Sequence, residues 1–199
     1  MVRTGWLEVL GKRSAMLHHY PFGHETALSL SPRHSEFVLL LAESGEGMTA
    51  AELAVALSAF DGPGVTVRAE MSRLRAVLAP VELGSRPYRL LQPVRTDVAE
   101  VRRSLRAGDY RRAVAAYRGP ILPFSQSPVV CDLRDDLHGR LRQGLLSSGD
   151  PDALLCFGDT DCGRDDLAVW TAAWRCLSPE SPRRPQVDAH LGWLLRRSS

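Results

Sequence analysis

The sequence predicts an α+β N-terminal domain followed by an all-α C-terminal domain in a chain of 199 residues. Short runs of strand-forming residues fill positions 6–30. Amphipathic helices and a final hairpin then fill 31–93. After this point the apolar residues recur only at helical spacing. We therefore expect two domains, 1–93 and 94–199.

The N-terminal strands are "WLEVL", "SAMLHHY" and "TALSL", which are separated by the turn-forming runs "GKR" and "PFGHE". Strands that are joined by such short connections pair with their neighbours in antiparallel fashion. We expect a small antiparallel sheet.

Two helices with recognisable ends follow the strands. The first begins at the "SP" of positions 31–32, an N-cap followed by proline, and ends at Gly45. The second begins with a capping box formed by Thr49 and Glu52 and stops at "DGPG", positions 61–64.

The third helix is "TVRAEMSRLRAVL", residues 66–78, and it is followed by a short hairpin over 81–93. One face carries an apolar stripe that would face the core: Val67, Met71, Leu74 and Leu78. Strands, three helices and a hairpin in this order are the parts of a winged helix-turn-helix.

The far side of this third helix is unusual for a solvent face because it combines small residues with arginines. Between Thr66 and Arg89 five arginines stand against two glutamates, whereas the whole chain carries a net charge of only +2. Small side chains let a helix backbone approach a DNA groove, and arginine pairs with phosphate or guanine. A solvated face on an arginine-rich protein is the alternative interpretation.

The segments "LSPRHSEFVLLLAESGEGMTAAELAVAL", "TVRAEMSRLRAVL" and "SRPYRL" resemble the OmpR/PhoB-type winged-helix DNA-binding domain. The resemblance implies that the third helix reads the major groove and that a wing near 84–88 contacts the DNA backbone or the minor groove. Pro87 departs from the family, which usually has glycine there.

The DNA-contacting residues follow from the arginine-lined face and from this resemblance. Glu70 and Arg73 would face the groove, and Arg75 would point toward a phosphate. The full candidate set is Thr49, Thr66, Arg68, Ala69, Glu70, Ser72, Arg73, Arg75, Ser85 and Arg86.

The second half reads as helices packed in pairs, similar to tetratricopeptide packing, without a clean repeat. Its segments "SLRAGDYRRAVAAYRGPILP" and "LRDDLHGRLR" resemble the bacterial transcriptional activator domain of actinobacterial antibiotic regulatory proteins. The last 50 residues, with "GRDDLAVW", are more weakly similar to related actinobacterial regulators, some of which carry a GAF-type sensor domain.

Several other classes of protein find little support in the sequence. No apolar run is long enough for a membrane span and no signal-peptide pattern is present, so we expect a cytoplasmic protein. The four cysteines have neither disulfide-framework nor zinc spacing. No nucleophile or metal motif indicates an enzyme, and we expect no metal and no cofactor.

Two further patterns have ordinary structural explanations. The acidic run 159–166 resembles a calcium loop, but Trp170 stands where a bidentate glutamate would be required, which favours helix capping. The histidines at positions 18, 19 and 24 could bind a metal ion if their strands aligned, but a polar edge of a β-hairpin explains them more simply.

The sequence therefore predicts a DNA-binding transcriptional regulator whose partner is double-stranded DNA, bound by a homodimer or in tandem. The helical half would mediate dimerisation, contact with RNA polymerase or response to a signal. Two alternatives stay open. One is a protein-interaction module on a winged helix that does not bind DNA, which Glu70 in the middle of the reading face favours. The other is a small-molecule sensor with a pocket among Trp170, Trp174 and Trp193.

Overall fold

The chain combines helices with a small sheet and is helical towards its C-terminus. The computed structural model describes residues 4–20, 24–57 and 67–197. Its first compact unit consists of Met1–Glu100 together with Pro120–Asp135, and its second of Val101–Gly119 together with Asp136–Ser199. This division differs from the expected single boundary at Pro93, because a later segment of the chain returns to the first unit.

The returning segment pairs with the end of the first strand region. Leu10 and Ile121 form an antiparallel bridge. Gly11 donates its N–H to the carbonyl of Pro120 at 2.8 Å, and Leu122 donates to that of Val9 at 3.1 Å. Because these bonds satisfy backbone groups that would otherwise lie unpaired at a sheet end, the segment belongs to the first unit's core.

The sheet of the first unit has the strand order β3-β2-β1-β6. Strand β1 (Gly5–Glu8) is antiparallel to β2 (Met16–His19), which is antiparallel to β3 (Thr26–Ser29), so the expected antiparallel arrangement is confirmed. Strand β6 (Val94–Thr96) was not expected from the sequence and pairs in parallel with β1. A run of three residues is too short to show a strand periodicity.

Asp97 joins the sheet to the next helix, α4 (Asp97–Arg106). Its Oδ2 accepts the N–H groups of Val9 and Leu10, each at 2.9 Å, and its Oδ1 accepts that of Val98 at 3.0 Å. Burial raises the pKa of this carboxyl, and the three N–H donors oppose the rise. The carboxylate therefore replaces strand pairing where β1 ends.

The helices of the first unit have the predicted ends. Helix α1 (Pro32–Ser44) starts at Ser31, whose hydroxyl accepts the N–H of His34, and stops at Gly45, where φ is 64°. Helix α2 (Ala50–Leu57) carries the capping box: Thr49 N–H donates to Glu52 at 2.7 Å, and Glu52 N–H donates to the Thr49 hydroxyl at 3.2 Å. The expected stop at 61–64 lies outside the described residues.

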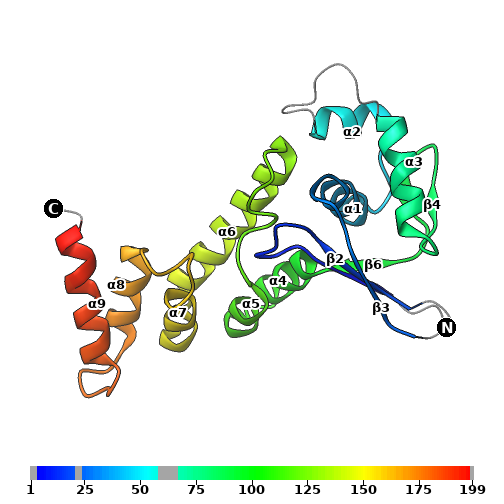
Figure 1. Ribbon diagram of the computed structural model, residues 1–199. Coiled ribbons are helices and arrows are strands. Elements are labelled where there is room, and N and C mark those ends of the chain that lie inside the picture. Colours follow the sequence, from blue (N-terminus) through cyan, green and yellow to red (C-terminus); the bar gives the residue numbers. More distant parts are fainter. Residues whose placement is uncertain (1–3, 21–23, 58–66, 198–199) are drawn as a thin grey trace. The chain divides into compact units, whose positions relative to one another are not determined.

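Helix α3 (Val67–Leu78) buries Met71, Leu74 and Leu78, which confirms three residues of the predicted apolar stripe. The fourth, Val67, is only half-buried. The expected hairpin is also present, with strand β4 (Leu83–Gly84) antiparallel to β5 (Arg89–Leu90). Figure 1 shows α3 running beside this hairpin in the first unit.

The second unit consists of helices. Helix α6 (Pro128–Ser148) buries Leu137, Leu141 and Leu145, which stand four residues apart on one face of the helix. The remaining helices are α5 (Tyr110–Ala116), α7 (Pro151–Gly158), α8 (Leu167–Cys176) and α9 (Arg184–Arg197). Helix α7 was not predicted from the sequence, since its eight residues are bounded by proline and glycine and show little more than two turns of periodicity.

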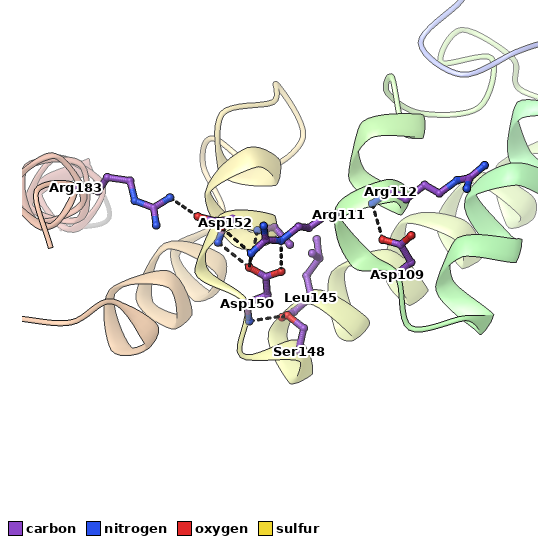
Figure 2. Close-up of polar contacts among 9 residues, drawn as sticks. Asp109, Arg111, Arg112, Leu145, Ser148, Asp150, Asp152 and Arg183 are labelled. Carbon is purple, nitrogen blue, oxygen red and sulfur yellow. Dashed lines mark hydrogen bonds and ion pairs between the residues drawn. The ribbon is translucent and has the colours of Figure 1, made fainter.

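Aspartate N-caps connect these helices through arginines (Figure 2). Asp150 caps α7 and accepts both Nε (2.6 Å) and Nη2 (3.0 Å) of Arg111 on α5. Arg111 also contacts Asp152 at 2.6 Å, and Arg183 reaches Asp152 at 2.5 Å. Hydrogen bonding to Arg111 lowers the pKa of Asp150 despite partial desolvation, so the capping carboxylate is held in its charged form.

Asp166 repeats the arrangement one helix later. It caps α8 and accepts Nε (2.5 Å) and Nη2 (3.0 Å) of Arg142 on α6. Burial raises the pKa of Asp166, but the Arg142 hydrogen bonds and the capped N–H groups outweigh burial and lower the pKa overall. In both cases a guanidinium from an earlier helix fixes the start of a later one.

Replacing Asp97 tests whether its carboxylate secures the first unit. Asp97→Ala should lower the free energy of unfolding by about 2–4 kcal/mol, because each buried N–H that loses its acceptor costs about 1–3 kcal/mol. Asp97→Asn should lose less, since its amide oxygen can still accept from Val9 and Leu10. Urea unfolding followed by circular dichroism measures both values. Equal stability of Asp97→Ala and the parent chain would contradict this role.

Candidate nucleic-acid interface

The N-terminus of α2, the first turn of α3 and the turn between β4 and β5 surround one groove in the first unit. Its volume is about 970 Å³. The described residues that line it are Thr49, Ala50, Arg68, Ser85, Arg86, Pro87 and Tyr88. Four of the residues expected to contact DNA are thus brought together from three separate elements: Thr49, Arg68, Ser85 and Arg86. We call this surface the α2–α3 groove.

A backbone bridge holds the hairpin turn against the start of α2. Met48 donates its N–H to the carbonyl of Tyr88 at 2.8 Å and accepts the N–H of Tyr88 at 2.8 Å. Gly47 makes this approach possible. Its φ is +87°, and a Cβ at this position would lie 2.5 Å from the Tyr88 carbonyl oxygen. The groove wall therefore depends on a glycine that the sequence analysis did not single out.

Arg75 ties α3 to the same turn. Its Nε and Nη2 each donate to the carbonyl of Leu83 at 3.3 Å, and Nη2 also donates to the Ser85 hydroxyl at 2.8 Å. The sequence-based expectation was that Arg75 points toward a phosphate. In the structure it instead fixes the position of Ser85 in the groove wall, because it lies near the C-terminal end of α3 beside β4.

Glu70 lies between α3 and α1 rather than alone on the exposed face of α3. Its Oε1 pairs with Nη1 of Arg73, and its Oε2 lies 3.5 Å from Nε2 of His34 on α1. The Glu70 side chain is 13% exposed, whereas that of Arg73 is 65% exposed. The carboxylate thus faces α1 and orients Arg73, and Arg73 presents the charge on the outer surface.

The outer face of α3 is otherwise made of small or basic residues. Its small exposed residues are Ala69, Ser72 and Ala76, and Val77 near the end of the helix is also exposed. The small side chains add little bulk above the helix backbone, so another surface can approach the helix closely. The remaining candidate, Thr66, lies outside the described residues.

The electrostatics of the α2–α3 groove favour an anionic ligand. Among the described residues that line it, two are arginines and none is acidic. Arg86 is exposed and adopts a φ of 65°, a left-handed conformation that is uncommon for a residue with a side chain. Such conformations occur where a turn is fixed by its surroundings, as the Met48–Tyr88 bridge fixes this one.

Ala50, Pro87 and Tyr88 also line the groove and were not among the sequence-based candidates. Pro87 and Tyr88 lie within the predicted wing, 84–88, of which only Ser85 and Arg86 were named as contact residues. Ala50 carries no side-chain signal of its own, and only its place next to the Thr49 cap could have indicated it.

The other candidate sites of the sequence are not assembled into clusters with obvious chemistry. His18 lies beside Glu8 and Glu25. In the described part of the chain no group of three or more histidine, cysteine, aspartate or glutamate side chains could hold a metal ion. The expected capping role of the acidic run 159–166 is confirmed at Asp166.

The three tryptophans proposed for a sensor pocket divide between two environments. Trp170 and Trp193 line a hollow of about 460 Å³ with His190, whose ring centroid lies 3.9 Å from that of Trp170. Trp174 instead donates its Nε1–H to Asp188 at 2.5 Å and lies under the guanidinium of Arg184. The pocket is thus not built as expected.

The cysteines are free thiols, as expected: Cys131, Cys156, Cys162 and Cys176. Cys156 and Cys176 are exposed, whereas Cys131 and Cys162 are partly buried. No helix among the described residues has the length and apolar character needed to cross a bilayer.

Comparison with known proteins gives two similarities. Residues 150–199 match a family model described as "YTH3-like protein, third C-terminal helical domain". An uncharacterized 47.3 kDa protein of Rhodococcus erythropolis, from the region 5′ of thcA, is 41% identical over 170 residues. That alignment covers 85% of this chain, which spans only 39% of the relative's length.

Substituting Gly47 tests how the groove wall is held. Gly47→Ala should destabilise the chain by clearly more than Gly45→Ala. At both positions φ is positive, which costs a residue with a side chain about 1 kcal/mol. Only at Gly47 does the new Cβ also collide with the Tyr88 carbonyl, whereas the space around Gly45 is open. Thermal unfolding of the two variants gives the comparison, and equal losses would show that the hairpin turn yields without cost.

Proposed function

We propose that this chain is a sequence-specific DNA-binding transcriptional regulator whose first unit is a winged helix-turn-helix. Helix α3 would lie in the major groove, and the turn 85–88 would act as the wing on the DNA backbone or in the minor groove. The observation that carries the proposal is the convergence of Arg68 and Arg86, with Thr49 and Ser85, around the α2–α3 groove.

The order of elements supports the proposal. An antiparallel sheet precedes three helices, and a hairpin follows the third, as in the OmpR/PhoB-type domain that the sequence resembles. Helix-turn-helix proteins place the second helix of the motif in the major groove with its N-terminal residues near the bases. Arg68, Ala69 and Ser72 lie in the N-terminal half of α3 and are exposed.

The charges divide into two roles. Arg68 and Arg86 line the groove and would contact phosphates, which set the position of the protein on the duplex. Arg73 pairs with Glu70 through one nitrogen, still carries further guanidinium N–H groups and would read a base edge. With a net charge of only +2, the whole chain attracts DNA weakly, so binding depends on this local cluster.

The helical unit would serve dimerisation, contact with RNA polymerase or response to a signal. The chain spans only 39% of the length of its Rhodococcus relative. We therefore propose these roles for the helical unit of this chain and not for a larger protein that contains it. Tandem or dimeric binding on repeated half-sites fits the limited affinity that one such DNA-binding module supplies.

The alternative is a winged helix that has lost DNA binding and holds a protein partner. An unpaired Glu70 on the reading face would have favoured it, since a lone carboxylate repels phosphate. The contacts of Glu70 with Arg73 and with the neighbourhood of His34 weaken that reason. Fluorescence anisotropy against pooled genomic fragments at two salt concentrations separates the two. Binding that weakens with salt supports DNA recognition, and no duplex binding at either concentration favours the protein partner.

The role of Arg73 as a base-reading residue can be measured on a preferred site. Arg73→Ala should weaken binding to that site by about 1–3 kcal/mol, because a bidentate contact with a base edge discriminates by that amount. Its affinity for random duplex should change little. Anisotropy titrations on both duplexes provide the comparison, and equal losses on the two would make Arg73 a phosphate contact.

Arg86 should act on all sequences alike. Arg86→Ala should weaken binding to specific and random DNA and reduce the slope of log affinity against log salt by about one unit, because one fewer phosphate is neutralised. Arg175→Ala on α8 removes the same charge from the helical unit and serves as the matched control. An unchanged slope in Arg86→Ala, or the same change in Arg175→Ala, would remove the wing from the interface.

A further inference from the structure

Helices α4, α5 and α6 border a second groove that lies wholly within the helical unit. Its volume is about 560 Å³. The described residues that line it are Arg102, Leu105, Arg106, Tyr110, Asp136, Arg140 and Gly144. We call it the α4–α6 groove. Its residues belong to neither the α2–α3 groove nor the salt-bridge network of Figure 2.

The floor of this groove is apolar. Leu105 and Tyr110 are both half-buried. The Tyr110 ring lies directly on Gly144, where an added Cβ would be 2.6 Å from Cε1 of the ring. The absence of a side chain at Gly144 therefore allows the ring to lie flat against α6 and to form part of the floor.

The rim of the groove carries positive charge from two helices. Arg102 and Arg106 stand four residues apart on α4, so both point to the same side of that helix. Arg140 comes from α6, where Asp136, Arg140 and Gly144 follow at the same spacing. The Asp136 carboxylate accepts the Nε–H of Arg140 at 2.7 Å. The two Nη groups of this guanidinium carry four further N–H donors. The described lining of the groove thus contains three arginines and one carboxylate, that of Asp136.

We propose that the α4–α6 groove binds an acidic polypeptide segment of a partner protein. Carboxylates of that segment pair with the guanidinium groups of the rim, and an apolar side chain between them packs on Leu105 and Tyr110. Arginine suits this task because its planar fork pairs with a carboxylate through two parallel hydrogen bonds. The proposal gives the helical half a partner of defined chemistry and does not require that α3 binds DNA.

The composition of the groove favours a peptide over a nucleic acid. A continuous phosphate backbone would meet Asp136 in the rim and would leave the apolar floor without a matching group. A peptide in which acidic and apolar residues alternate satisfies both parts. Apolar anchors surrounded by charged pairs are the usual composition of a peptide-binding groove.

The test uses the full chain and a short fluorescein-labelled peptide of repeating Glu-Glu-Leu. We expect saturable binding by anisotropy, and Arg106→Glu combined with Arg140→Glu should weaken it by about tenfold or more. Arg118→Glu combined with Arg175→Glu changes the net charge equally outside the groove and should change the affinity by less than about twofold. Arg106→Gln alone should give a smaller loss in the same direction, and circular dichroism checks that each variant is folded.

Three results would overturn the proposal. The first is an equal loss in both double variants, which assigns binding to net charge. The second is equal affinity for a Glu-Glu-Ser peptide, which removes the apolar floor. The third is random duplex DNA that displaces the peptide and itself binds the α4–α6 variant more weakly, which makes the groove a nucleic-acid surface. The salt dependence of DNA binding by Arg86→Ala does not depend on any of these three results. If the peptide proposal fails, the DNA-binding proposal is still tested by that measurement.

Discussion

The buried carboxylate of Asp97 is the interaction on which the first unit depends. It accepts backbone N–H groups from the chain that leaves β1 and from the first turn of α4, so one side chain joins the N-terminal strand to a segment almost 90 positions later. Next to it, the Thr96 hydroxyl accepts the N–H of Ala99 and donates to Glu43 of α1. Sheet, α1 and α4 thereby share one polar junction within a core that is mostly apolar. Polar groups at such a depth stabilise a fold only when each is satisfied, and here they are.

From this junction the placement of the α2–α3 groove follows in steps. The sheet positions α1, and α1 supplies His34 beside Glu70. Helix α3 then holds the hairpin through Arg75, and the hairpin is bridged to Met48. The charged residues that line the groove therefore stand on elements that are held together by side-chain contacts and by one pair of backbone hydrogen bonds. A surface built this way loses little conformational entropy when a ligand binds, which favours affinity.

Much of the local structure could be predicted from the sequence because it depends on neighbouring residues. The cap at Ser31, the capping box at Thr49 and the stripe on α3 are all set within a few positions. Strand β6 and the return of segment 120–135 depend on partners far away in the chain, and helix α7 is too short to show its period.

The same distinction holds for the candidate site. Thr49, Arg68, Ser85 and Arg86 were chosen from the arginine-lined face of α3 and from the resemblance to the OmpR/PhoB-type domain, and all four line the α2–α3 groove. The inward turn of Glu70 and the use of Arg75 as a tie to the hairpin depend on where α1 and β4 lie, and no local pattern contains that information.

The return of segment 120–135 to the first unit also determines how the chain can be divided. The Ser127 hydroxyl donates to the carbonyl of Ala56 in α2, and the Ser125 hydroxyl donates to the carboxylate of Glu36 in α1. The guanidinium of Arg134 stabilises the same segment by donating hydrogen bonds to the carbonyls of Ile121, Leu122 and Ser125. A fragment that stops at Pro93 lacks this support and exposes the strand end beside Leu10, an open edge that promotes aggregation. Each unit is therefore made of two separate stretches of the chain. Any single junction between Pro93 and Asp135 divides at least one unit between two parent chains, and a junction soon after Asp135 divides the second, so neither unit can be exchanged as one continuous segment.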